Sequence, residues 1–305
     1  MKSKINVAIK IAKASSIKVD EVFLFREMMN IFNSYSMSKA IFVKEVHGKK
    51  GMVKYNSKYR TTPPEVEIAD LLLLTYNNSK EKINDNRLKI SFLQAKYLKG
   101  TYKNFLNFKA NIFQWELLKD KPQLINAVNN IPFNILNFRD DYSSLTTYGI
   151  FYPDSASGDI DFLYTLPALI KPKNTIVSSK SKGNKNFEFI CRKGLSNPDT
   201  SCILGLSSKE ALTTCSMDIF ENQVLSWKVG APINDGIKPY VVGLLSNIRK
   251  GLSDTTIVDE VIEGLGKINP DSNNSEFNVD ESLPVLLVIT DSSLYEDYLK
   301  EKNKG

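Results

Sequence analysis

A continuous apolar run at residues 68–76 limits the fold of this chain more than any other feature of its sequence. A run without alternation between apolar and polar residues is typical of a strand that is buried on both faces. The polar stretch at 77–87 contains Asn-Asn-Ser and Asn-Asp-Asn, which predict a loop, and 89–98 is predicted to be the next strand. We therefore expect a sheet with layers on both sides, in an α/β or α+β domain.

Helix and strand patterns also alternate elsewhere in the chain. Val22, Phe25 and Met29 recur at helical spacing, which predicts a helix at 19–32. The same reasoning predicts, in the first half, a strand at 40–46, a basic turn at 47–51, a returning strand at 52–59, a break at the prolines of 61–64 and a helix at 102–119. In the second half it predicts strands at 174–178, 187–191 and 284–290, and helices at 217–227 and 258–265.

Several classes of protein are excluded by residue content. The single histidine, His47, excludes sites that need two histidines, and the three cysteines have no metal-ligand spacing and are too few for a disulfide framework. No apolar run approaches the roughly 18 residues that span a membrane, and the N-terminal segment lacks the apolar stretch of a signal peptide. We expect a cytoplasmic protein that does not associate with membranes.

Charge is distributed unevenly along the chain. Residues 1–110 hold 21 Lys and Arg against 9 Asp and Glu, which gives +12, whereas residues 111–305 have a net charge of −6. A basic half favours a polyanionic partner, and the alternative is a lysine-rich surface that keeps the protein soluble. Charge alone does not distinguish DNA from RNA.

Three polar residues stand at the ends of the two predicted buried strands. Asp70 lies at the mouth of the first, and Gln94 and Lys96 share one face of the second because alternate residues of a strand point the same way. Buried polar side chains need partners, which a facing aspartate and a divalent cation would supply. The alternative is that Asp70 is a turn residue and Lys96 an edge lysine.

This pattern resembles the PD-(D/E)xK nuclease superfamily, whose signature is an aspartate on one strand and a (D/E/Q)xK tripeptide on the next. The resemblance covers about residues 40–120 and includes features typical of an uncharacterised bacterial branch: His47-Gly48, Glu67-Ile-Ala-Asp70, Gln94-Ala-Lys96 and Gln114-Trp-Glu-Leu-Leu118. It implies a restriction-endonuclease-like mixed central sheet flanked by helices, with a nuclease-like core at 1–125. Residues 126–305 would add C-terminal α/β elements packed on that core, since no stretch looks like a flexible linker.

The resemblance also implies a site and an activity. Asp70, the Gln94 side-chain oxygen, the Ala95 carbonyl and Glu67 would hold Mg²⁺ or Mn²⁺, and Lys96 would orient the attacking hydroxide or neutralise the transition state. His47 would contact a phosphate or carry a proton, unless it is an ordinary turn residue. Three lysines would contact the nucleic-acid backbone: Lys49, Lys50 and Lys54.

Two departures from the superfamily pattern leave the activity open. Gln94 replaces the acid of the third motif and can supply an oxygen ligand but no charge. Glu67, three residues from Asp70, points to the opposite face of a regular strand, so the second acid could instead be Glu21 or Glu27 of the preceding helix, or Glu45.

We therefore expect a Mg²⁺-dependent endonuclease that acts on DNA, in restriction or phage defence. The first alternative is a catalytically weak or inactive nuclease-fold module that binds nucleic acid or serves in a defence complex. A homodimer is compatible with either. The second alternative is a metabolic or scaffolding protein in which the QxK tripeptide is accidental.

Overall fold

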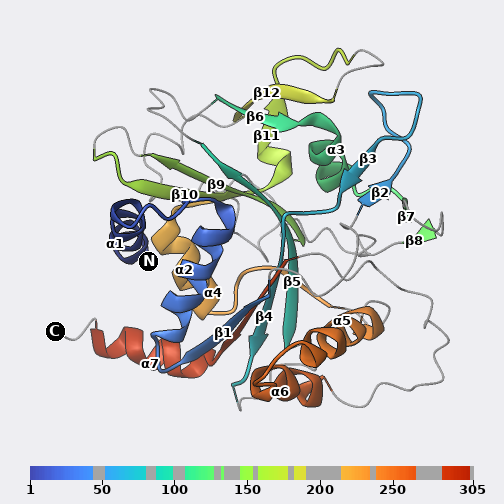
Figure 1. Ribbon diagram of the computed structural model, residues 1–305. Coiled ribbons are helices and arrows are strands. Elements are labelled where there is room, and N and C mark those ends of the chain that lie inside the picture. The colour runs from blue at the N-terminus through green and yellow to red at the C-terminus, as the bar shows by residue number, and fades with distance from the viewer. Residues whose placement is uncertain are drawn as a thin grey trace.

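The computed structural model describes residues 1–43, 52–79, 87–98, 107–126, 132–133, 145–153, 157–177, 182–189, 214–233, 238–265 and 284–302. These residues form a central mixed sheet, two smaller sheets and helices on both faces of the central sheet (Figure 1). The predicted α+β class is therefore confirmed.

The central sheet combines strands from both ends of the chain. Its order is β1 (Ser38–Val43), β15 (Val285–Thr290), β4 (Leu71–Asn77), β5 (Leu88–Tyr97), β9 (Thr146–Pro153), β10 (Ile160–Thr165) and β13 (Thr214–Cys215), and β14 (Ala231–Pro232) also pairs with β5. The β15–β4 and β5–β9 pairs are parallel and the other pairs are antiparallel. Strands from the predicted regions 1–125 and 126–305 are thus hydrogen-bonded directly to one another within this sheet.

Two smaller sheets lie beside the central one. The first has the order β3 (Glu65–Glu67), β2 (Met52–Lys54), β7 (Leu124–Asn126) and β8 (Pro132–Phe133). The second has the order β11 (Ile170–Pro172), β12 (Asn184–Phe189) and β6 (Asn107–Asn111), and it lies at the top of Figure 1. The 3₁₀ turn η2 (Pro167–Leu169) leads into β11.

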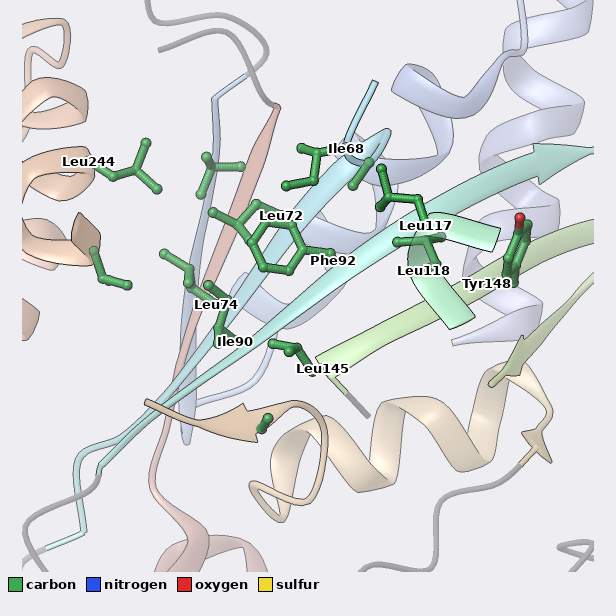
Figure 2. Packing of buried hydrophobic residues seen from close by; sticks show 14 of the residues in the cluster. Ile68, Leu72, Leu74, Ile90, Phe92, Leu117, Leu118, Leu145, Tyr148 and Leu244 are labelled. Atoms are coloured by element: carbon green, nitrogen blue, oxygen red, sulfur yellow. The ribbon is translucent and has the colours of Figure 1, made fainter. Parts of the chain in front are cut away.

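Alternation along the central strands divides the core into two layers. Leu71 and Leu73 face the helices α1 (Lys2–Ala14), α2 (Glu21–Asn33), α4 (Met217–Leu225) and α7 (Ser292–Lys302). Leu72 and Leu74 face the other way, toward α3 (Ile112–Asp120), α5 (Lys238–Lys250), α6 (Thr256–Gly264) and the small sheets. Figure 2 shows residues of this second layer, among them Leu72, Phe92, Ile68 and Leu117 of α3. The central strands are thus buried on both faces, as the apolar run predicts.

Most predicted elements in the described segments are confirmed, with shifted ends. The helix at 19–32 is α2, which begins after Asp20, whose side chain accepts a hydrogen bond from the Phe23 N–H at 3.1 Å. The predicted strands at 68–76, 89–98 and 284–290 correspond to β4, β5 and β15, and the predicted helices at 217–227 and 258–265 correspond to α4 and α6. The strand predicted at 187–191 overlaps β12.

Three predictions are wrong. Residues 107–111 of the predicted helix at 102–119 form strand β6, because Phe108 and Ala110 are buried at strand spacing, and Asn111 then caps α3. Residues 52–59 do not form a strand that pairs with β1. Only 52–54 form a strand, β2, which pairs with β3 and β7, whereas β1 pairs with β15. Residues 174–177 form no strand, and 44–51 lie outside the described residues.

Candidate active site

Asp70 is positioned by the hydrogen bonding of two adjacent antiparallel strands. Its N–H donates to the Leu93 carbonyl at 3.1 Å, immediately before β4 begins. Because Leu71 pairs with Leu93, Asp70 lies across from Gln94. Pleating then places Asp70, Gln94 and Lys96 on the same face of the sheet as Leu72 and Phe92. This face is the one covered by α3, α5 and α6.

Three donors from β5 converge on one oxygen of Asp70. Oδ2 accepts hydrogen bonds from the Ala95 N–H, at 2.9 Å, and from the side-chain amide of Gln94. The Lys96 ammonium lies 3.6 Å from the same oxygen. The structure therefore brings together Asp70, Gln94, Ala95 and Lys96, the four predicted site residues of the aspartate and QxK motifs. The second carboxylate oxygen, Oδ1, accepts no hydrogen bond from the described residues.

The Asp70 carboxylate is an unfavourable place for a negative charge. Burial raises its pKa above the ordinary value, and the negative charges of Glu67 and Glu21 raise it further. The Lys96 charge and the Ala95 N–H act in the opposite direction without reversing the shift. The side chain of Asp70 still has 27% of its surface exposed, so a ligand can reach it. A cation at this carboxylate would relieve the unfavourable charge.

Two buried polar atoms near Asp70 have no hydrogen-bond partner among the residues that the structure describes. Gln94 is fully buried, and its Oε1 is unpaired because the amide directs its NH₂ toward Asp70. The Tyr148 hydroxyl is also unpaired, and Tyr148 lies opposite Gln94 in the parallel β5–β9 ladder. Burial raises the pKa of Tyr148, and the charge of Asp70 raises it further. Unpaired buried polar atoms cost about 1–3 kcal/mol each, so a water or a ligand that paired with them would be favourable at this position.

Other acids approach the site from two sides. Glu67 ends β3, where it pairs with Met52, and its negative charge acts on Asp70. Glu21 begins α2, and its charge also raises the pKa of Tyr97, after burial. Glu27, the other helical candidate, interacts with Asn30 at 3.4 Å. Of the two helical acids, Glu21 is thus the one whose charge acts on Asp70.

The donor set is poor in carboxylates. Within the described segments, no group of three or more His, Cys, Asp or Glu side chains could hold a metal ion. A cation at Asp70 would therefore depend on neutral oxygen donors as well, and Gln94 would supply one only if its amide turned over to direct Oε1, in place of the NH₂, toward Asp70. Mg²⁺ keeps several waters and commonly uses only one or two protein carboxylates, so the residues fit a hydrated Mg²⁺.

The remaining predicted residues are distributed around the site. Lys54 ends β2 opposite Glu65, on the same face of the small sheet as Glu67, because Val53 and Val66 fill the other face. His47, Lys49, Lys50 and Glu45 lie outside the described residues.

Sequence reasoning missed Tyr148 and the structural role of the Gln114–Leu118 motif. Tyr148 stands in an apolar strand and carries no local signal. Glu116 is buried and accepts hydrogen bonds from the Ser57 hydroxyl at 2.5 Å, the Lys58 N–H at 2.6 Å and the Tyr55 hydroxyl at 3.0 Å. This motif therefore fastens the segment after β2 to α3.

Comparisons with known proteins add no assignment. In the described part of the chain, no helix has the length and apolar character needed to cross a membrane. No protein-family model, curated protein or solved structure matches the chain. The resemblance to PD-(D/E)xK nucleases therefore rests on the sequence motifs at 40–120 alone.

Proposed function

We propose that this protein is a metal-dependent nuclease that hydrolyses phosphodiester bonds in DNA, and that it acts in restriction or phage defence. The observation that carries the proposal is the convergence of Gln94, Ala95 and Lys96 on the Asp70 carboxylate. A carboxylate and a lysine on one face of adjacent strands, at a partly exposed strand end, suit binding of a cation beside a phosphate. The place in defence follows from the resemblance alone.

Each residue then has a defined task. Asp70, with Gln94, the Ala95 carbonyl and Glu67, would hold Mg²⁺ or Mn²⁺, which supplies a bound water of lowered pKa and offsets charge on the scissile phosphate. The desolvated Asp70 favours a cation, and the Gln94 amide would turn over so that Oε1 faces that cation in place of the NH₂. Lys96, 23% exposed, would stabilise the negative charge of the transition state.

Contacts away from the reacting phosphate would hold the substrate. Lys54, with Lys49 and Lys50, would bind the phosphate backbone, and His47 would contact a phosphate or carry a proton. Lysine contacts to phosphates release counterions, so binding should weaken steeply as salt increases.

A catalytically inactive module that binds nucleic acid, alone or in a defence complex, is the second candidate. It is favoured by the hydrogen bonds that Asp70 Oδ2 accepts from Gln94 and Ala95, and by the absence from the described residues of a group of three or more metal-ligating side chains. In this alternative the same residues stabilise the strand end and perform no chemistry.

Cleavage of plasmid and single-stranded DNA in Mg²⁺ or Mn²⁺ separates these candidates. Wild type and Lys96→Ala are compared with Lys39→Ala, a matched control whose exposed lysine lies on β1 and pairs with Glu260 at 3.6 Å. Metal-dependent cleavage that is lost only in Lys96→Ala supports the nuclease. Equal cleavage by all three proteins refutes this site. Binding without cleavage by wild type favours the module.

A further inference from the structure

The small sheet β11–β12–β6 has one apolar face and one polar face. Its apolar face buries Ile170, Phe187 and Phe108. The Phe108 ring stacks on Phe187 at 5.8 Å between centroids and lies 6.4 Å from the Tyr148 ring. Because Tyr148 is the β9 neighbour of Gln94, this sheet covers the side of the central sheet that carries Asp70. Its other face is directed away from the core.

The outward face is defined by register. The Lys173 N–H donates to the Asn186 carbonyl at 2.8 Å, and Asn186 pairs with Lys109, so Lys173, Asn186 and Lys109 form one row across the three strands. The neighbouring row contains Lys171 paired with Glu188. We call this surface the lysine face; it consists of Lys109, Lys171, Lys173, Asn184, Asn186 and Glu188.

Cations outnumber anions on the lysine face. Glu188 is the one acid among its six residues, and it is shared by Lys171 at 3.3 Å and Lys173 at 4.0 Å. Lys109 is exposed and has no ion-pair partner in the described segments. The strands are about 4.8 Å apart, so Lys173 and Lys109 are rooted about 10 Å from each other, with an asparagine between them.

The side chains on this face suit phosphates better than bases. Lysine presents three donors and asparagine two, and such donors are the usual contacts to phosphate oxygens. None of its six residues is aromatic and could stack on a base, since Phe108 and Phe187 point inward. Its chemistry therefore matches a phosphodiester backbone, without preference for sequence.

We propose that the lysine face binds the phosphodiester backbone of nucleic acid, independently of metal and of the Asp70 site. If the nuclease function proposed above holds, the strand bound at this face is also the strand that is cleaved; this part of the inference rests on that function. The small sheet that carries the lysine face packs through Phe108 against Tyr148, the neighbour of Gln94. The face therefore lies on the same side of the central sheet as Asp70, where it could hold that strand.

The test measures binding of fluorescent DNA and RNA oligonucleotides in EDTA, over a series of salt concentrations. The variant is Lys109→Gln, Lys171→Gln and Lys173→Gln together. Its control removes the same charge from exposed lysines on helices of the opposite layer: Lys10→Gln, Lys13→Gln and Lys300→Gln. Replacement of the same three face lysines by arginine keeps the charge and tests that the sheet tolerates substitution.

We expect the glutamine variant to bind at least tenfold more weakly, with a salt slope smaller by about 3, since each phosphate contact contributes about 0.9. The control and the arginine variant should stay within about twofold of wild type. Any of four results would overturn the proposal. The glutamine variant could bind as tightly as wild type, or the control could lose as much affinity as the glutamine variant. Wild type could fail to bind, or polyglutamate could compete as strongly as DNA.

The same assay separates this proposal from the proposed function. Lys96→Ala should still bind in EDTA, whether or not wild type cleaves. If wild type binds nucleic acid but does not cleave it, the lysine-face proposal stands and the nuclease proposal is refuted. If wild type cleaves and the glutamine variant binds normally, the nuclease proposal stands and the lysine-face proposal is refuted.

Discussion

The Lys96 ammonium lies 3.6 Å from Asp70 Oδ2, yet the pKa of Asp70 is raised. The charge of Lys96 lowers this pKa, but burial, with Glu67 and Glu21 nearby, outweighs it. A salt bridge formed for stability would ordinarily depress the pKa of its carboxylate. This pair therefore differs from a salt bridge that serves stability alone, and the raised pKa is consistent with the proposed binding site.

Asp70→Asn should stabilise the protein at neutral pH. A raised pKa in the folded state means that ionisation of Asp70 costs stability, and this cost grows as pH rises from the unfolded value of 3.8 through the folded pKa. Asparagine can still accept from the Ala95 N–H without carrying the charge. Urea unfolding of both proteins at pH 4 and pH 8 should show an advantage for the variant only at pH 8. A variant less stable than wild type at pH 8 would contradict the raised pKa.

Mn²⁺ should raise the melting temperature of the wild type and not of Asp70→Asn. Because the metal competes with the proton at Asp70, its affinity should fall as pH drops through the raised pKa. Calorimetric titration at pH 8 and pH 5 measures this change. Asp297→Asn is the matched control, since Asp297 lies on α7 with 67% of its side chain exposed. An equal Mn²⁺ response in Asp70→Asn would place any bound metal elsewhere.

The meeting of Asp70, Gln94 and Lys96 could be predicted because it follows from local rules. Alternation places Gln94 and Lys96 on one face, and a loop between consecutive strands favours antiparallel pairing, which brings Asp70 opposite Gln94. Tyr148 joins the site through a parallel pairing, and Lys54 and Glu67 come close through a separate small sheet. Such long-range pairings leave no periodic trace in a single sequence.

The fold shows the same division between local and distant information. The apolar run predicted the double burial of β4, but β15 lies between β1 and β4 although more than 200 residues separate it from them. The sequence predicts a single helix at 102–119 because apolar residues at positions 108, 112 and 115 fit helical spacing, whereas 107–111 form β6. Asn111, which caps α3 through a 2.9 Å bond from the Phe113 N–H, marks the true boundary.

Glu116→Gln should destabilise the protein by about 2–3 kcal/mol, since hydrogen bonds to buried charged groups contribute more than neutral ones. The carboxylate accepts from Ser57, Lys58 and Tyr55, whereas an amide would turn its NH₂ toward at least one of these donors. Tyr55→Phe removes a hydroxyl whose single proton is shared by Glu116, at 3.0 Å, and the Phe113 carbonyl, at 2.6 Å, and should cost about 1 kcal/mol. Urea unfolding compares the two variants, and an equal or smaller loss in Glu116→Gln would contradict the proposed fastening of this segment.

Gly264→Ala should destabilise the protein by about 1–3 kcal/mol, as overpacking of a core does. A Cβ at Gly264, the last residue of α6, would overlap the Tyr76 hydroxyl and lie 2.7 Å from its ring carbon Cζ. Tyr76 is buried in β4, so its ring cannot move away freely. Gly243→Ala is the matched control: a Cβ there meets nothing within 4 Å, and alanine inside helix α5 should stabilise by about 0.5–1 kcal/mol. If thermal unfolding shows that Gly264→Ala lowers stability and Gly243→Ala raises it, the close approach to Tyr76, rather than backbone freedom, requires glycine at 264. A Gly264→Ala variant more stable than wild type would contradict this packing. Tyr76→Phe removes the overlapping hydroxyl, so the double variant should recover part of the loss.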